Sequence, residues 1–131
     1  MPHQAVTIGK LVIFLNIVKY KYILFTMDMK GSELCPRVEA AFGLLAKKWA
    51  GLIVLALLDG ALYFSELEAA IPPISARVLS LRMRELELEG LVSRDVSSSS
   101  PPRVSYALTT KGEALAIPIR GIANWARAWM R

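Results

Sequence analysis

The sequence predicts a mainly α-helical domain with one small β-hairpin, running from about residue 32 to the C-terminus. Three observations favour this fold. Apolar residues recur at helical spacing after residue 35, two short runs rich in β-type residues follow, and a longer helical segment closes the chain. With 131 residues, the chain has room for one compact domain and no separate cofactor domain.

Two helices are predicted on either side of the Lys47-Lys48 pair. Pro36 suits the first position of a helix because its missing N–H would be unpaired there. The apolar residues that follow at i, i+3, i+4 and i+7 are Val38, Ala41, Phe42 and Leu45. A second helix is expected over about residues 49–58, with an apolar stripe at Trp49, Leu52, Ile53, Ala56 and Leu57. Asp59-Gly60 should end it, because glycine accepts the left-handed conformation that follows helix ends.

A short helix, a tight turn and a longer helix come next. Leu62 and Phe64 suit a very short strand, and a helix of about two turns is expected from Ser65 until two prolines at 72–73 force a turn. Ser75 can cap a longer helix, which Gly90 closes. Its buried side is predicted to contain Leu79, Met83 and Leu86. This order of elements is a helix-turn-helix.

The remaining chain predicts a hairpin and a final helix. Residues 91–96 and 104–108 are expected to be strands, separated by a flexible tip that contains four serines and two prolines. The pattern Thr110-x-x-Glu113 suggests a capping box at the start of the last helix. Its apolar residues fall at spacings of three and four: Leu115, Pro118, Ile122, Trp125 and Trp129. Pro118 is expected to kink this helix.

Several short motifs occur in the same order as in a known family. They are Cys35-Pro36, Lys48-Trp49, Asp59-Gly60, Phe64-Ser65-Glu66-Leu67, Pro73-Ile74-Ser75, Glu89-Gly90-Leu91-Val92 and Pro102-Arg103-Val104. Over roughly residues 35–125 the chain therefore resembles the HxlR-type winged helix-turn-helix regulators of bacteria, a MarR-like group. The resemblance implies a sequence-specific DNA-binding transcriptional regulator, with the hairpin as the wing. It also implies a dimeric repressor that responds to an effector or to thiol redox state.

The longer helix of the helix-turn-helix carries the candidate base-reading residues. Arg77, Ser80 and Arg84 lie at i, i+3 and i+7, opposite the predicted buried stripe. Arginine can bond to guanine with two hydrogen bonds, and serine can bond to several bases. The resemblance implies that this face lies in a major groove. The alternative is a solvated face in which these arginines pair with neighbouring glutamates. Leu81 and Arg82 depart from the family pattern, which often has polar residues there.

Further DNA contacts are expected at the helix N-terminus and in the wing. The N–H groups at Ser75 and Ala76 suit a phosphate, although Ser75 is foremost a cap. The resemblance implies that Arg103 reaches a minor groove or a phosphate; the alternative is a polar loop with an incidental arginine. At Lys47 and Lys48, a phosphate contact and a solvated turn are both open.

Cys35 is the only cysteine, which excludes an intramolecular disulfide and fits a reducing cytoplasm. It stands directly before Pro36, where a helix dipole would stabilise a thiolate. The resemblance implies a possible redox sensor for a small electrophile or oxidant. The alternative is an inert residue that packs beneath the dimer interface.

Apolar residues on the first and last helices predict a homodimer. The expected interface consists of Val38, Phe42, Ile119, Ile122, Trp125 and Trp129. So much apolar surface is unusual on an exposed helix. A two-fold dimer would place two base-reading helices about 34 Å apart on palindromic double-stranded DNA. The alternative is that part of this apolar stripe lines an effector pocket.

Residues 1–30 form an N-terminal extension before the domain at 31–131. The net charge is +5, and the extension carries about three of these charges, so a DNA site requires local clustering in the domain. The apolar stretch Leu11–Phe25 is too short and too charged for a membrane span, and no cleavage site follows it. It is interpreted as an added packing element, as a basic membrane-surface anchor, or as residues upstream of an initiator at Met27 or Met29.

An enzyme is not expected, because the sequence shows no phosphate-cradling glycine loop and no metal-ligand spacing. We therefore expect no cofactor, no metal and no membrane partner. The rival function is a winged-helix module that binds another protein through the same surface without specific DNA binding.

Overall fold

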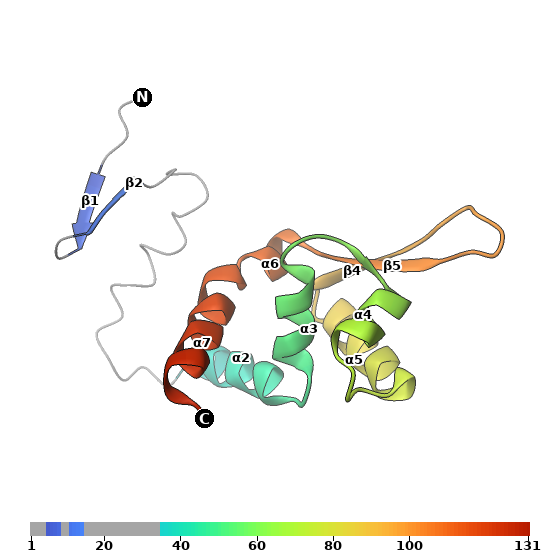
Figure 1. Cartoon of the computed structure of the whole chain (residues 1–131), viewed down its shortest axis with the longest axis horizontal. Coiled ribbons are helices and arrows are strands. Elements are labelled where there is room, and N and C mark those ends of the chain that lie inside the picture. Colours follow the sequence, from blue (N-terminus) through green and yellow to red (C-terminus); the bar gives the residue numbers. More distant parts are fainter. Residues whose placement is uncertain (1–4, 9–10, 15–34) are drawn as a thin grey trace. The chain divides into compact units, whose positions relative to one another are not determined.

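The computed structural model describes residues 5–8, 11–14 and 35–131 (Figure 1). Contacts divide the chain into two units, Met1–Val38 and Glu39–Arg131. No single helix among the described residues is long and apolar enough to cross a membrane. Helices α2 (Pro36–Ala46) and α3 (Ala50–Leu57) together have the required length and composition, but they meet at an angle of 85°.

The first unit contains a two-stranded antiparallel ladder. Strand β1 (Ala5–Ile8) pairs with strand β2 (Leu11–Phe14). The start of the predicted apolar stretch Leu11–Phe25 is thus a strand. The rest of that stretch, from residue 15 onward, and both alternative initiators, Met27 and Met29, lie outside the described residues.

Helices α2 (Pro36–Ala46) and α3 (Ala50–Leu57) confirm the first two predicted helices. Trp49 joins them in a left-handed conformation, with φ of 79°. The buried side of α3 differs from the predicted stripe, because Val54 is fully buried whereas Leu52 is 49% exposed. Helix α3 contacts α7 (Ala116–Trp129) as well as α4 (Phe64–Ala70) and β5 (Val104–Leu108). Neighbours on several sides therefore decide which of its apolar residues are covered (Figure 1).

The helix-turn-helix consists of α4 (Phe64–Ala70) and α5 (Ala76–Leu88). Helix α4 begins one residue earlier than predicted, and the Tyr63 N–H at its start donates to the Glu66 carboxylate at 2.7 Å. Ser75 caps α5 as predicted, since its hydroxyl accepts from the Val78 N–H at 3.2 Å. The predicted buried stripe of α5 is also confirmed: it consists of Leu79, Met83 and Leu86.

Strands β4 (Val92–Val96) and β5 (Val104–Leu108) form the predicted hairpin. The short strand β3 (Leu62–Tyr63) adds to the other edge of β5, so the sheet order is β3-β5-β4. The hairpin extends beyond the helices in Figure 1. Val92 is buried in β4 and the other four residues of that strand are exposed. In β5, Tyr106 is buried and its neighbours are half-buried, so β5 packs on the core while β4 is the exposed strand of the hairpin.

The last predicted helix is wrong in two respects. It is divided into α6 (Thr110–Glu113) and α7 (Ala116–Trp129). The cap is Thr109 rather than Thr110, because the Thr109 hydroxyl accepts from the Gly112 N–H at 3.1 Å. Residues 114 and 115 interrupt the helix just before Pro118, which lies in the first turn of α7, where the absence of an N–H breaks no helical bond.

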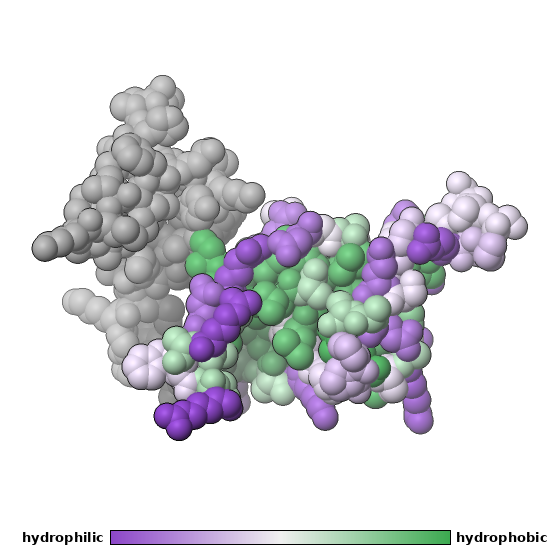
Figure 2. All heavy atoms as spheres, in the orientation of Figure 1, coloured by the Kyte–Doolittle hydropathy of each residue, from purple (hydrophilic) through white to green (hydrophobic). Residues whose placement is uncertain are grey.

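The core lies between α3, α4, α5 and the sheet. Its members include Ile53, Val54, Leu67, Leu79, Met83, Leu86, Val92 and Tyr106. Figure 2 shows apolar side chains gathered over α3, with hydrophilic side chains on the visible side of α7 and along the hairpin. The helix-turn-helix and the wing therefore share one core.

Three hydrogen bonds connect the end of α5 to the end of the wing, and we call them the clamp. The Thr109 hydroxyl donates to the Gly90 carbonyl at 2.5 Å, and the Thr109 N–H donates to the Leu91 carbonyl at 3.0 Å. The Lys111 ammonium donates to the Glu89 carbonyl at 2.6 Å. Gly90, with φ of 71°, turns the chain at this point. The clamp fixes the wing at the end of the helix from which it emerges.

Candidate DNA-binding surface

The face of α5 that points away from the core carries Arg77, Ser80 and Arg84, all of them exposed. Leu81 and Leu88 share this face and are 50% and 83% exposed. Neither Arg77 nor Arg84 forms an ion pair with any described residue. The alternative of pairing with neighbouring glutamates is therefore not realised, and both guanidinium groups can bind a ligand.

The N-terminal end of α5 supplies a second kind of donor. Ser75 uses its hydroxyl to accept from the Val78 N–H, which occupies one of the first-turn donors that have no partner within a helix. The N–H groups of Ala76 and Arg77 belong to the same turn. Both residues are exposed, so a phosphate could approach these donors at the positive end of the helix dipole.

Arg103 lies at the base of the wing loop and stacks on an aromatic ring. Its guanidinium carbon is 3.5 Å from the centre of the Tyr63 ring. The Arg103 N–H donates to the Ser97 hydroxyl, and the Ser97 N–H donates to the Arg103 carbonyl, both at 2.8 Å. Stacking orients a guanidinium while its edge remains free to donate hydrogen bonds. Arg103 is therefore held in place at the edge of the exposed wing.

Sequence reasoning missed Tyr63 as the support of Arg103. Forty positions separate the two residues, and no local spacing links them. They meet because β3 pairs with β5, where Tyr63 lies opposite Ser105. Only the sheet register could have identified this contact.

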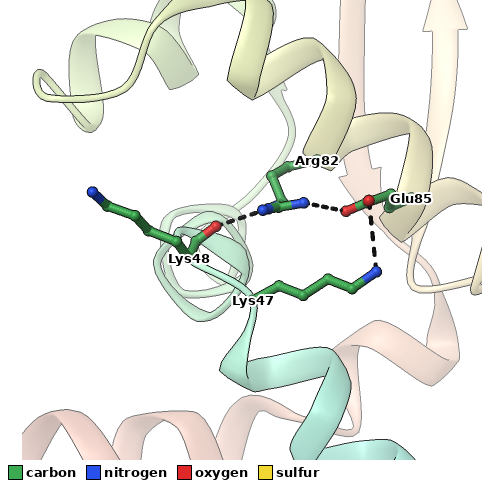
Figure 3. Close-up of polar contacts among 4 residues, drawn as sticks. All are labelled: Lys47, Lys48, Arg82 and Glu85. Carbon is green, nitrogen blue, oxygen red and sulfur yellow. Dashed lines mark hydrogen bonds and ion pairs between the residues drawn. The ribbon is translucent and has the colours of Figure 1, made fainter.

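A polar network joins α5 to the turn between α2 and α3 (Figure 3). The Arg82 side chain donates from Nε to the Lys48 carbonyl at 2.8 Å and from Nη1 to Glu85 Oε2 at 2.6 Å. The Lys47 ammonium lies 3.6 Å from Glu85 Oε1. The hydrogen bond from Arg82 and then its charge lower the pKa of Glu85, and Lys47 contributes less. This network fixes the position of α5, the helix that carries the candidate base-reading residues.

The network includes Lys47, one of the two lysines for which a phosphate contact and a solvated turn are both predicted. The Lys47 ammonium pairs with Glu85, and the Lys47 side chain is 46% exposed. Lys48 is exposed, and its ammonium lies 4.8 Å from the centre of the Trp49 ring. The spacing of Arg82 and Glu85, at i and i+3, is visible in the sequence, but the contact with the Lys48 carbonyl is not.

Residues 44–131 match the family described as HxlR-like helix-turn-helix. The chain belongs to the HxlR-like helix-turn-helix family. It is thus a DNA-binding transcriptional regulator with a winged-helix fold, as the sequence motifs predicted.

Two curated relatives of this HxlR-like chain come from Bacillus subtilis. The HTH-type transcriptional regulator YvaP is 53% identical over 102 residues, which cover 78% of this chain and 94% of YvaP. The HTH-type transcriptional regulator YodB is 43% identical over 96 residues, which cover 73% of this chain and 86% of YodB. Both relatives are described as HTH-type transcriptional regulators.

Solved structures of this family share the fold. The reduced form of YodB from B. subtilis superposes with a TM-score of 0.66 at 41% identity and covers 75% of this chain and 96% of its own. The redox regulator HypR in its oxidised form superposes with a TM-score of 0.70 at 34% identity and covers 74% of this chain and 99% of its own.

In this HxlR-like chain, Cys35 is partly exposed and stands directly before α2. Its carbonyl accepts from the Val38 N–H at 3.0 Å, which begins the helix. An oxidant or electrophile could therefore approach the sulfur in the described part of the chain.

The residues predicted for the dimer interface of this HxlR-like chain fall into two groups. Exposed fractions are 70% for Phe42, 57% for Ile122, 57% for Trp125 and 76% for Trp129, and Val38 is half-buried. Ile119 is only 6% exposed and belongs to the core of its own chain. We therefore remove Ile119 from the predicted interface: it lies beside the exposed stripe of α7, on the side that faces α3.

Proposed function

We propose that this HxlR-like regulator is a homodimer that binds a palindromic operator in double-stranded DNA and represses transcription by occupying the promoter. The observation that carries the proposal is the exposed face of α5, with Arg77 and Arg84 free of ion pairs among the described residues. The working domain is assigned to residues 31–131, and residues 1–30 are an extension to it.

Each protomer would contact DNA in three ways. Arg77, Ser80 and Arg84 lie in the major groove, where an arginine can donate two hydrogen bonds to guanine. The N–H groups at Ser75 and Ala76 receive a phosphate. From the wing, Arg103 binds the DNA backbone or the minor groove, and this contact does not depend on the base sequence. Phosphate contacts then position the protein, and contacts from α5 provide specificity.

The exposed side chains of α2 and α7 support the homodimer. A helix with Ile122, Trp125 and Trp129 all more than half exposed is typical of a surface that a partner covers. Val38 and Phe42 on α2 complete the proposed interface. A two-fold arrangement would present two reading helices about 34 Å apart to two half-sites.

Cys35 is the proposed point at which an effector acts. HypR is described as a redox regulator, and YodB has been solved in reduced, diamide-treated and quinone-bound forms. A thiolate can add to a quinone, or two thiolates can form a disulfide as they reduce diamide. Either change would alter the relative orientation of the reading helices and release the operator.

A gel-shift titration tests this function directly. The full chain is titrated against DNA from beside its own gene with excess competitor, before and after diamide or a quinone. Specific binding that Arg77→Ala weakens supports the DNA assignment, and loss on oxidation in the wild type but not in Cys35→Ser supports the sensor. Specific binding that oxidation does not change makes Cys35 structural. Absence of specific binding favours the protein-interaction module.

A further inference from the structure

Leu81 is an apolar side chain between the two arginines on the polar reading face of α5. Leu81 is 50% exposed, and it follows Arg77 by four positions and precedes Arg84 by three. These three residues therefore lie on the same side of the helix. The exposed half of Leu81 points in the direction that the two arginines would use to reach DNA.

The major groove offers one apolar group to such a side chain. Among the base edges exposed there, only thymine carries a methyl group, whereas the others present hydrogen-bond donors and acceptors. We propose that Leu81 packs against the methyl group of a thymine and makes that base part of the recognised half-site. This inference rests on the proposed function, since it requires α5 to lie in the groove.

The surroundings of the two exposed leucines of α5 favour Leu81 over Leu88 as the residue that contacts the thymine. Its neighbour Arg82 is only 17% exposed and is bonded to the Lys48 carbonyl and to Glu85, so the backbone at Leu81 is fixed. Leu88 is 83% exposed but ends α5. Recognition helices contact bases mainly through their N-terminal residues, which leaves Leu88 outside the base contacts.

Helix geometry limits where the thymine lies. With a rise of 1.5 Å per residue, Leu81 is about 6 Å along the axis from Arg77 and about 4.5 Å from Arg84. Successive base pairs are about 3.4 Å apart. The thymine should therefore lie within about two base pairs of the guanines contacted by the arginines.

Selection from a random duplex pool provides the DNA for the test. The full-length chain is bound to duplexes with about 20 randomised base pairs, and the enriched motif is resynthesised. Each thymine is then replaced by deoxyuridine in both half-sites, which removes only the methyl group. Affinities are measured for the wild type, for Leu81→Ala and for the matched control Leu88→Ala, with helix content checked by circular dichroism.

At one thymine, loss of the methyl group should lower the affinity of the wild type about fourfold per half-site, as expected for one buried aliphatic carbon. Leu88→Ala should show the same loss, and Leu81→Ala should bind both duplexes equally. The inference is overturned if no thymine is enriched, if deoxyuridine has no effect on the wild type, or if Leu81→Ala remains sensitive. If no motif is enriched at all, the proposed function itself fails.

Discussion

Arg82 of α5 and the main chain of Lys48 are joined by a hydrogen bond of 2.8 Å, although 34 positions separate them. Together with the contact from Arg82 to Glu85, this bond attaches the reading helix to the turn between α2 and α3 (Figure 3). Arg82 thus contacts other parts of the protein, although it lies on the candidate recognition helix. It positions α5, whereas Arg77 and Arg84 on the exposed face remain available to contact DNA.

Arg82→Ala should destabilise the fold by about 1–2 kcal/mol, because it removes two hydrogen bonds, one of them to a carboxylate. Urea denaturation measures the change. Arg84→Ala on the exposed face is the matched control and should change the free energy of unfolding by less than about 0.5 kcal/mol while weakening operator binding. Equal destabilisation by the two variants would contradict the division of α5 into two faces.

The stability that Glu85 contributes should depend on pH. Arg82 lowers the pKa of Glu85 in the folded chain, so the contribution is fully present above the ordinary glutamate pKa of about 4.3. It is lost as the pH falls through the folded pKa. The difference in urea midpoint between wild type and Glu85→Gln should be constant near neutrality and shrink below about pH 4. A difference that stays the same at acidic pH would contradict the contribution of the contact between Arg82 and Glu85.

The contact between Arg103 and Tyr63 predicts that the wing contributes to DNA affinity whatever the base sequence. Arg103→Ala should weaken specific and non-specific binding alike and reduce the salt slope by about 1. Tyr63→Leu should produce a smaller loss, because the charge remains while its aromatic support is removed. In the double variant, the two losses should not add. A sequence-dependent effect of Arg103→Ala would instead indicate base recognition by the wing.

The exposed stripe of α7 predicts a change in oligomeric state. Trp125→Glu places a charge in the proposed apolar interface and should yield monomers in analytical ultracentrifugation at micromolar concentration. Asn124→Glu introduces the same charge at the adjacent exposed position and should remain dimeric. A monomeric wild type, or two variants that behave alike, would be evidence against the interface.

Gly112 predicts a steric defect at the start of α6. A Cβ atom at this position would collide with the Leu91 carbonyl oxygen, so Gly112→Ala should lower the free energy of unfolding by about 1–3 kcal/mol. Gly51 of α3 has open space where its Cβ would lie, and Gly51→Ala should be neutral or stabilising by up to about 1 kcal/mol. Thermal denaturation of the two variants compares them directly.

Local patterns in the sequence predicted most of the helical elements. The apolar spacing of α5 and the cap at Ser75 depend only on neighbouring residues, and both are confirmed. The sequence pattern predicts Thr110 as the cap of the following helix, whereas the structure has Thr109 in that role. Both residues carry a hydroxyl group, and only the fold decides which hydroxyl accepts from the Gly112 N–H. Neighbouring residues alone therefore could not distinguish them.

Contacts between distant segments account for the remaining differences. Ile119 lies next to the exposed stripe of α7 but packs into the core, since a small difference in angle around a helix separates a core position from a surface position. The same limit applies to the contact between Arg103 and Tyr63, which requires the pairing of β3 with β5. Sequence spacing can identify a face but not the element that covers it.

The clamp at Thr109 and Lys111 has a consequence for the DNA itself. Because three hydrogen bonds hold the wing to the residues that end α5, the two cannot hinge independently within one protomer. On the proposed function, the distance along the duplex between the bases contacted by α5 and the backbone contacted by the wing is fixed inside each half-site. Any variation in operator length that the regulator tolerates must then lie between the half-sites, where the two protomers meet.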